Sequence, residues 1–296
     1  MFNKFSIVIP TFENSDYLKL CINSILKNSS FSHQIIVHIN GHDKNTEKIL
    51  LEKKITYTKS IKNIGLCSGV NIASKKAATN YILYAHDDMY FLPNWDSALY
   101  EEVKKINHKN FYLSMTHISH MGDVKGDIQH IQYDCGSNII EFNENKLLEN
   151  FKKFNFRNLQ GTHWAPHLIH VDLWNKIGGF SEEFNPGFAS DPDLNMKLWM
   201  ENVRIFKGVS LSRVYHFGSL TTRKNKKITP NKGKKTFLLK WKFTVEFFNK
   251  HYLKRGTTYD GPLREPNKNF GYFSDLFISK IKFMLTKYFD EKKKLL

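Results

Sequence analysis

The sequence predicts an α/β fold in which a doubly wound, mixed sheet is followed by a basic, aromatic-rich helical extension. Three observations lead to this prediction. Short apolar runs of strand length alternate with amphipathic helical patterns over the first 110 or so residues. Polar and acidic residues follow directly where these runs end. Beyond residue 222 the composition changes toward lysine, arginine and aromatic residues.

The first half of the chain alternates strands and helices, which is typical of a Rossmann-like sheet with right-handed crossovers. The first apolar run ends at Pro10, and a helix begins at Asn14 or Ser15. The expected strands cover residues 5–10, 34–39, 55–59 and 81–85, and the expected helices lie near residues 15–26, 46–51, 66–77 and 94–106. Loops after such strands meet at one edge of the sheet, so residues 10–13, 40–41, 63 and 87–88 should lie together.

The second half is less regular. We expect a strand at residues 111–115, no clear periodicity up to about Leu159, and ordered structure again over residues 161–170. A short helix capped by Asp172 should lead into residues 178–180, and a second helix should be capped by Asp191. A strand over residues 203–217 completes this part.

Composition limits the class of protein. The hydrophobic content of 41% is ordinary for a soluble domain, whereas the net charge of +16 indicates anionic partners. The three cysteines (Cys21, Cys67 and Cys135) show neither a disulfide framework nor metal-ligand spacing, which favours a reducing compartment. The first apolar run is too short for a signal peptide, and no run approaches the roughly 20 apolar residues that span a bilayer. We therefore expect a cytoplasmic protein that touches a membrane only at its surface.

Two adjacent acids, Asp87 and Asp88, directly follow the apolar run at residues 81–85. Two carboxylates at the end of a buried strand repel each other unless a cation joins them, and a divalent cation held with phosphate oxygens is a common solution. The alternative is a turn or helix cap that happens to contain two aspartates.

The C-terminal extension, residues 223–296, is basic. Residues 223–255 contain twelve lysine or arginine residues and one acid, Glu246. The last helix places a set of large apolar side chains on one face: Phe277, Ile278, Ile281, Met284, Leu285, Tyr288 and Phe289. A basic amphipathic helix of this kind is typical of a membrane-surface element or an oligomer contact, and the alternative is packing against the rest of the chain.

Six segments in order resemble a known family: FSIVIPTFE, IIVHINGHD, NIGLCSGVN, YILYAHDDMYFLPNW, IGGFSEEFNPGFASDPDL and VYHFGS. From Phe5 to Thr222 the chain resembles the inverting GT-A-fold glycosyltransferases called family two. The resemblance implies a GT-A catalytic domain over residues 1–222, with a nucleotide-binding half at about 1–110 and an acceptor-binding half at about 111–222.

The resemblance also implies roles for individual residues. Those implied to bind the nucleotide sugar are Pro10, Thr11, Glu13, Asn40, Asn63, Gly65 and Asp87. Asn40 stands where the family usually has an acid. Asp88 is the favoured metal ligand of the acid pair, with His216 in the place of a further ligand. Asp191 matches the catalytic base, although Ser190 replaces its usual glutamate neighbour.

The chemistry of the residue types agrees with these roles. A divalent metal, Mn²⁺ or Mg²⁺, neutralises charge on a departing nucleoside diphosphate, and a distant acid is suited to act as the general base. His163, Trp164 and His167 either line an acceptor site, because aromatic faces stack on sugars, or belong to the core. Asp193 is either an acceptor-binding acid or a solvated helix residue. One or two of Arg223, Lys224, Lys226 and Lys227 are candidates to close over the diphosphate.

The resemblance, together with these residues, therefore implies a metal-dependent, inverting glycosyltransferase that moves a sugar from a nucleoside-diphosphate sugar to a glycan or lipid-linked acceptor, in cell-surface polysaccharide assembly. A nucleotidyltransferase is disfavoured because the loop after the first strand, PTFEN, contains no glycine. A non-catalytic nucleotide-sugar-binding module remains an alternative. The +16 charge is concentrated in the extension and accompanies no nucleic-acid-binding motif, so we expect no nucleic-acid partner. A homo-oligomer and an anionic membrane surface are open as further partners.

Overall fold

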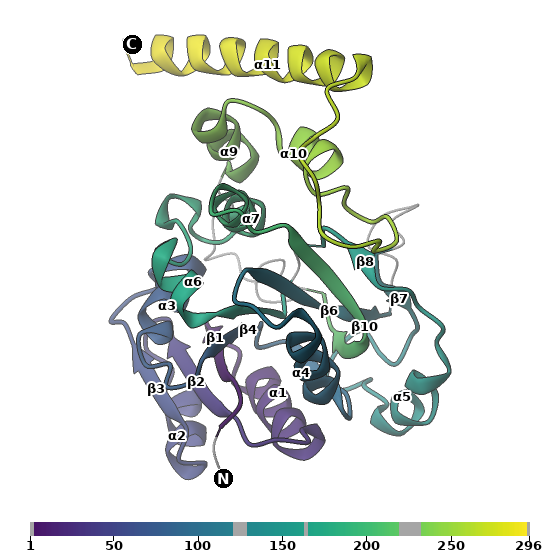
Figure 1. Ribbon diagram of the computed structural model, residues 1–296. Coiled ribbons are helices and arrows are strands. Elements are labelled where there is room, and N and C mark those ends of the chain that lie inside the picture. Colours follow the sequence, from purple (N-terminus) through teal and green to yellow (C-terminus); the bar gives the residue numbers. More distant parts are fainter. Residues whose placement is uncertain (1–2, 121–128, 163–164, 219–231, 295–296) are drawn as a thin grey trace.

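The computed structural model describes residues 3–120, 129–162, 165–218 and 232–294. Within these residues the fold is α/β, built on one mixed sheet of ten strands with helices on both faces (Figure 1). The order of strands along the sheet is β3-β2-β1-β4-β9-β6-β10-β5, with β7 beside β6 and β8 beside β10. The predicted fold class is thus confirmed, including the helical C-terminal region.

The strands have the following bounds: β1 Ser6–Thr11, β2 Gln34–Ile39, β3 Thr56–Lys59, β4 Tyr81–Tyr84, β5 Met89–Phe91, β6 Phe111–Ser119, β7 Ile131–Gln132, β8 Leu159–Gln160, β9 His167–His170 and β10 Ile205–His216. The α-helices are α1 Ser15–Asn28, α2 Lys44–Glu52, α3 Leu66–Ser74, α4 Trp95–Ile106, α5 Glu144–Asn150, α6 Val171–Lys176, α7 Ser190–Met200, α9 Gly233–Trp241, α10 Val245–His251 and α11 Phe270–Lys294. Two short 3₁₀ helices, η1 Phe151–Lys153 and η2 Glu182–Phe184, complete the elements.

The half formed by β3, β2, β1 and β4 is entirely parallel, as predicted. Its central strand, β1, is buried along its whole length, and Ile7, Val8 and Ile9 are fully enclosed. A parallel strand covered by helices on both faces must be apolar throughout, which is why this run contains no alternation of polar residues. The carboxyl ends of β1, β2 and β4 therefore lie together at one edge.

The other half of the sheet is mixed. Strand β9 pairs antiparallel with both β4 and β6, and so joins the two halves. Strand β10 runs parallel to β6 and antiparallel to β5. The sequence analysis did not predict β5, because three residues directly after the Asp87–Asp88 turn are too few to give a periodic signal.

Several local predictions about helices are corrected by the structure. Asp191 is the second residue of α7 and not its N-cap, which is Ala189 at φ 64°. The helix α6 is capped by the His170 side chain, which accepts a hydrogen bond from the backbone N–H of Asp172, so Asp172 is not the cap. The stretch expected to be irregular up to Leu159 contains α5 and η1, which are too short to show periodicity.

The extension after residue 231 packs against the sheet domain. Phe237, Val245, Phe248 and Leu253 are buried in the same hydrophobic core as β1 and β4. The helices α9 and α10 lie over α7, and α11 lies across them at the far end of the molecule (Figure 1). The predicted domain boundary at residues 222 and 223 falls outside the described residues.

Across the residues that the structure describes, no helix combines the length and apolarity required to cross a bilayer.

Candidate active site

The ends of β1 and β4 bring together residues that the sequence analysis assigned to the nucleotide sugar. The Thr11 hydroxyl donates a hydrogen bond to Asp87 Oδ2 at 2.7 Å, and the backbone N–H of Asn40 donates to the Thr11 carbonyl at 2.9 Å. Pro10 precedes Thr11 within β1, and Glu13 lies just beyond it at a positive φ of 49°. The edge of the sheet thus gathers three of the four predicted loops in one place.

The fourth loop, at residues 63–65, is tied to the same edge. The Asn40 side chain accepts a hydrogen bond from the N–H of Ile64 at 3.2 Å, and Asn63 accepts one from Gly65 at 2.9 Å. Gly65 has a φ of 88°, and a Cβ there would lie 2.2 Å from Asn185 Oδ1. That oxygen also accepts from the N–H of Cys67 at 2.9 Å, so only glycine lets this loop pass Asn185.

The two adjacent acids are buried and influence each other. Asp87 and Asp88 are 6% and 2% exposed. Burial, and then the charge of Asp88, raise the pKa of Asp87 to about 7, while hydrogen bonds from Thr11 and Asn14 act in the opposite direction. Two neighbouring buried carboxyl groups repel each other when both are ionised. They therefore favour either a shared proton or a bound cation that also contacts a ligand.

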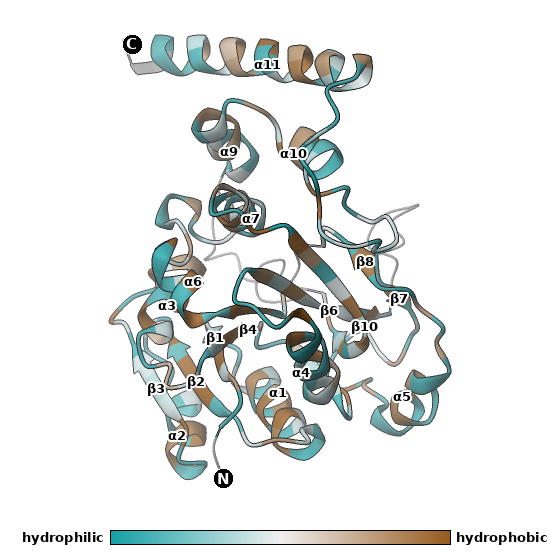
Figure 2. Ribbon diagram, viewed as in Figure 1, coloured by the Kyte–Doolittle hydropathy of each residue, from teal (hydrophilic) through white to brown (hydrophobic). Residues whose placement is uncertain are grey.

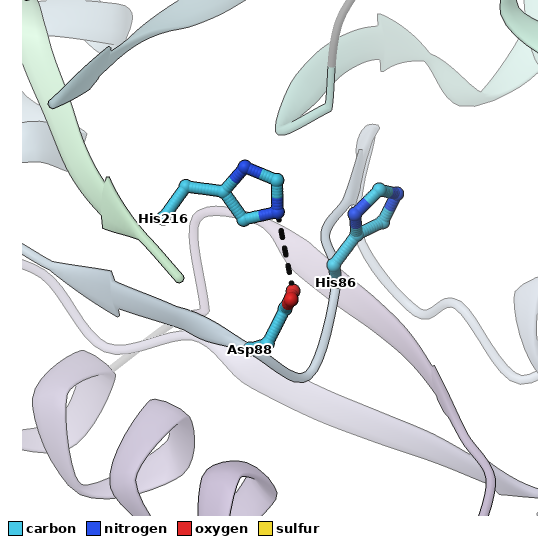
Figure 3. A group of neighbouring side chains, drawn as sticks. All are labelled: His86, Asp88 and His216. Atoms are coloured by element: carbon cyan, nitrogen blue, oxygen red, sulfur yellow. Dashed lines mark ion pairs between the residues drawn. The ribbon is translucent and has the colours of Figure 1, made fainter. Parts of the chain in front are cut away.

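A cluster of His86, Asp88 and His216 lies at this edge, with one ligand atom from each side chain within 4.8 Å of the others (Figure 3). His216 Nε2 lies 3.3 Å from Asp88 Oδ1. Strand pairing produces this proximity, because His216 is opposite Met89 in the antiparallel pair of β10 and β5. The N–H of Phe217 also donates to the Asp88 carbonyl at 3.2 Å.

The donor set of this cluster suits a divalent transition metal, since it combines two imidazole nitrogens with one carboxylate oxygen. Burial lowers the pKa of His86 to about 4, with Asp88 opposing and His216 adding to that effect. A neutral imidazole presents the lone pair that a metal requires. The sequence analysis predicted Asp88 and His216 but missed His86, although it adjoins the acid pair in the run His-Asp-Asp.

Asp191 lies in the first turn of α7 beside a cavity of about 820 Å³. The cavity is lined by residues of α7, α9 and α10, by the residues just before α7 and α9, and by the chain that follows α10. Among the lining residues are Asp191, Phe188, Lys232, Lys235, Glu246 and Arg255. Asp191 Oδ1 is buried and has no hydrogen-bond partner within the described parts of the chain. Burial raises the pKa of Asp191 to about 7, and the positive charge of Arg255 acts against that rise.

Tyr84, at the end of β4, is affected by the charges of both groups of acids. Burial raises the pKa of its hydroxyl well above the usual value, and the charges of Asp191, Asp87 and Asp88 raise it further. All three carboxyl groups therefore lie within electrostatic range of one buried side chain. Asp88 and Asp191, which are distant in sequence, belong to one region of the molecule.

The residues considered for an acceptor site have different surroundings. His163 and Trp164 lie outside the described residues. His167 is 1% exposed and lies 3.0 Å from the Tyr112 hydroxyl, which confirms its alternative as a core residue. Asp193 is fully buried, so its reading as a solvated helix residue is wrong. Arg223, Lys224, Lys226 and Lys227 also lie outside the described residues.

Asp193 is instead held by three side chains. Its Oδ2 accepts from the Ser181 hydroxyl at 2.6 Å, and its Oδ1 accepts from Trp241 Nε1 at 2.8 Å. Lys240 Nζ lies 2.9 Å from the same Oδ1. Two of these partners come from α9, so Asp193 joins α7 to the extension.

Comparison with known proteins gives two results. The family model described as Glycosyl transferase family 2 matches residues 6–172, which is more than half of the chain. No curated protein matches the chain in a sequence search.

Solved structures with the same fold include the crystal structure of residues 1–349 of S. aureus TarS, at 16% identity and a TM-score of 0.54. The match covers 72% of this chain and 60% of that one. The complex of TarS 1–349 with UDP-GlcNAc matches at 17% identity and a TM-score of 0.52, covering 73% and 61% of the two chains. GalNAc-T7 with UDP, GalNAc and Mn²⁺ matches at 14% identity and a TM-score of 0.52, covering 72% and 44%. At these identities the likeness establishes the GT-A fold, and the chain spans less than two thirds of each of these proteins.

Proposed function

Because the chain belongs to glycosyl transferase family 2, we propose that it transfers a sugar from a nucleoside-diphosphate sugar to a hydroxyl group of an acceptor, with inversion at the anomeric carbon. The observation that carries this proposal is the convergence of the His86–Asp88–His216 cluster and Asp191 on the surroundings of Tyr84. The His86–Asp88–His216 cluster is suited to binding the leaving diphosphate, and Asp191 is suited to accepting the proton of the incoming hydroxyl group. The UDP-GlcNAc complex of TarS, which has the same fold, supports a nucleotide-sugar donor.

The donor occupies the edge of the sheet formed by β1, β2, β4 and the start of α3. The residues proposed to bind it are those that the sequence analysis named: Pro10, Thr11, Glu13, Asn40, Asn63, Gly65 and Asp87. Thr11 fixes the Asp87 carboxylate by its hydrogen bond, and Asn40 fixes the loop at residues 63–65. These contacts hold the site in shape before the donor arrives, which lowers the entropic cost of binding.

His86, Asp88 and His216 hold a divalent cation, and the two imidazoles favour Mn²⁺ over Mg²⁺. Mn²⁺ in the GalNAc-T7 structure supports this choice. When bound, such a cation supplies Lewis-acid neutralisation of the diphosphate. The chain contributes two imidazoles, of which burial keeps that of His86 neutral by lowering its pKa, and one carboxylate; Asp88 and His216 are buried.

Asp191 accepts the proton of the attacking hydroxyl. A base with a pKa of about 7 is half deprotonated at neutral pH and still strong enough to take a proton as the new bond forms. The acceptor enters the cavity beside Asp191. We assign acceptor binding to this cavity and assign Asp193 to holding the extension. His163 and Trp164, which lie outside the described residues, stay proposed acceptor-binding residues. The acceptor is a glycan or a lipid-linked molecule of cell-surface polysaccharide assembly, and the enzyme works in the cytoplasm at the inner face of the membrane.

The test is a thermal-shift screen of nucleoside diphosphates and nucleotide sugars, with and without Mn²⁺. A bound donor stabilises the folded protein in proportion to the logarithm of its concentration over Kd, so the largest shift identifies the donor. Asp88→Ala and His216→Ala should remove the part of the shift that depends on Mn²⁺.

The matched control is His251→Ala. His251 Nε2 pairs with Asp275 at 2.7 Å, much as His216 pairs with Asp88, but it lies in the extension, away from the cluster. The control should keep the full Mn²⁺-dependent shift. If His216→Ala also keeps it, or if no nucleotide sugar stabilises the protein under any condition, the proposed site is wrong.

A further inference from the structure

The helix α11 exposes a broad apolar face. Nine of its large apolar side chains are exposed, with fractions from 41% at Ile281 to 90% at Phe270. They are Phe270, Phe273, Phe277, Ile278, Ile281, Met284, Leu285, Tyr288 and Phe289. At 100° per residue they cover roughly 160° of the helix circumference from Phe270 to Phe289. Apolar patches of this extent on a folded protein mark an interaction surface.

The opposite face of α11 is already packed, which fixes the orientation of the helix. Tyr272 and Ser279 are buried, and the Tyr272 ring packs against Phe247 of α10 in a tilted arrangement with ring centroids 5.2 Å apart. Asp275 pairs with Lys250 at 2.7 Å, and Asp290 pairs with Lys235 of α9. Packing against the rest of the chain therefore uses this face, and the exposed apolar side chains lie on the other face. In Figure 2, α11 contains both hydrophilic and hydrophobic residues along its length.

Lysines border the apolar face. On the helical circumference Lys282 lies beyond one margin, and Lys280 and Lys287 lie beyond the other. All three are exposed, and Lys287 also pairs with the exposed Glu291 at 3.7 Å. The acids Asp275 and Asp290 are on the packed face. An apolar stripe with lysines on both sides matches the boundary between acyl chains and anionic headgroups, because the lysine stems follow the apolar surface and the ammonium groups reach the phosphates.

We propose that α11 docks the protein on an anionic lipid bilayer, with its axis in the plane of the membrane and its apolar face in the acyl region. The alternative is that a second copy of the chain covers the apolar face of α11. Two copies would bring together net charges of +16 each, whereas an anionic surface has the complementary sign. The apolar face is also wider than the two positions in seven that a paired-helix seam uses.

Docking through α11 also places the proposed acceptor cavity near the membrane. Lys235, which lines the cavity beside Asp191, is the residue that pairs with Asp290 of α11. An acceptor sugar carried on a lipid would then reach Asp191 while its tail stays in the bilayer. This step rests on the proposed function, whereas docking itself does not.

The experiment is flotation of the full-length protein with vesicles of phosphatidylcholine, with and without phosphatidylglycerol. The protein should float with the anionic vesicles, and raising the salt concentration should weaken the binding. The triple variant Phe277→Ser, Ile281→Ser, Leu285→Ser should bind at least about tenfold more weakly, since each lost apolar side chain removes part of the insertion energy. The matched control is Ile61→Ser, Ile140→Ser, Leu211→Ser, whose side chains are 71–93% exposed elsewhere, and it should bind like the unchanged protein.

A second pair of variants tests the charges. Lys280→Gln, Lys282→Gln, Lys287→Gln should lose the preference for anionic vesicles, by roughly fivefold for each lysine. Lys44→Gln, Lys48→Gln, Lys54→Gln removes three exposed lysines in and beside α2, at the other end of the molecule (Figure 1), and should change little.

The proposal is overturned if the protein does not bind anionic vesicles, or if both apolar triples lose binding equally. It is also overturned if light scattering shows a dimer that becomes a monomer in the Phe277, Ile281, Leu285 variant, because a second copy would then cover the face. The donor-dependent thermal shift is measured without lipid. If the protein shows the donor-dependent thermal shift but does not float with anionic vesicles, membrane docking is wrong and the proposed function stands. If it floats but no donor changes its melting temperature, the proposed function is wrong and membrane docking stands.

Discussion

The role of base proposed for Asp191 couples burial to catalysis in a single residue. A buried carboxyl oxygen without a partner is costly to the folded protein, and it is also what a general base needs before its substrate arrives. Asp191→Asn should lower kcat by about 10²–10⁴-fold while donor binding is kept. Steady-state kinetics together with the donor-dependent thermal shift measure the two effects. An equal loss of binding and turnover would contradict the role of base.

The pKa of Asp191 gives a second prediction. Because burial raises that pKa to about 7, kcat should fall as the pH drops below about 7 and the base becomes protonated. The effect on stability has the opposite sign. A carboxyl whose pKa is raised on folding disfavours the folded state once the pH exceeds its unfolded value of about 4. Asp191→Asn should therefore raise the melting temperature at pH 8 and lose this advantage near pH 4. A gain of the same size at both pH values would mean that ionisation of Asp191 is not the cause.

Gly65 provides a test of the donor loop with a built-in control. Gly65→Ala adds a Cβ that lies 2.2 Å from Asn185 Oδ1 at a φ of 88°, so it combines a backbone cost with a clash. Gly178→Ala has a similar φ of 70° and no atom within 4 Å, so it carries the backbone cost alone, about 1–2 kcal/mol. Urea unfolding should show a larger loss for Gly65→Ala, and only that variant should lose the donor-dependent thermal shift. Equal losses of unfolding free energy in the two variants would contradict tight packing of the loop at Gly65 against Asn185.

At the scale of elements, the first half of the sheet followed from the sequence, whereas in the second half the sequence predicted β6 in part and β10 but not the short strands beside them. Strands β1 to β4 are apolar runs with helices between them, and their pattern is local. The pairing of β5 with β10 joins segments that are far apart in the chain, and β5 has only three residues. That pairing is what places His216 beside Asp88, so the resemblance could suggest the two residues but the sequence pattern could not predict their contact.

The attachment of α9 to α7 depends on one buried acid. Lys240 pairs with two carboxylates at nearly equal distances: Asp193 at 2.9 Å, fully buried, and Glu183 at 2.8 Å, 49% exposed. Asp193→Ala should cost about 1.5–3 kcal/mol in unfolding free energy, because it removes charge-assisted hydrogen bonds from Trp241 and Ser181 as well. Glu183→Ala should cost less than about 1 kcal/mol, since solvent screens that pair. Chemical denaturation measures both, and similar losses would show that burial does not decide the strength of these contacts.

At the scale of the whole molecule, composition and packing divide the chain at different places. The change in composition after Thr222 suggests an appendage, because lysine and arginine become frequent there. Packing shows that α9 and α10 share the core of the sheet domain. A basic segment can do this because its aromatic and aliphatic side chains are buried, among them Phe237, Val245 and Leu253, while its described lysines are not. A change of charge along a sequence therefore indicates which partners the surface can bind. It does not by itself mark a domain boundary.

Two truncated proteins test whether the folded domain ends at Thr222 or includes α9 and α10. Phe237, Phe248 and Leu253 are fully buried, and burying each such side chain contributes about 1.5–3 kcal/mol. Their sum approaches the roughly 5–15 kcal/mol that stabilises a typical folded protein, so a chain ending at Thr222 should aggregate or unfold. A chain ending at Pro266 loses α11 and keeps that core, so it should melt cooperatively and retain the donor-dependent shift while no longer floating with anionic vesicles. A cooperatively melting, donor-binding chain that ends at Thr222 would show that the sheet domain is complete without the extension, and the core shared with α9 and α10 would then be dispensable for folding.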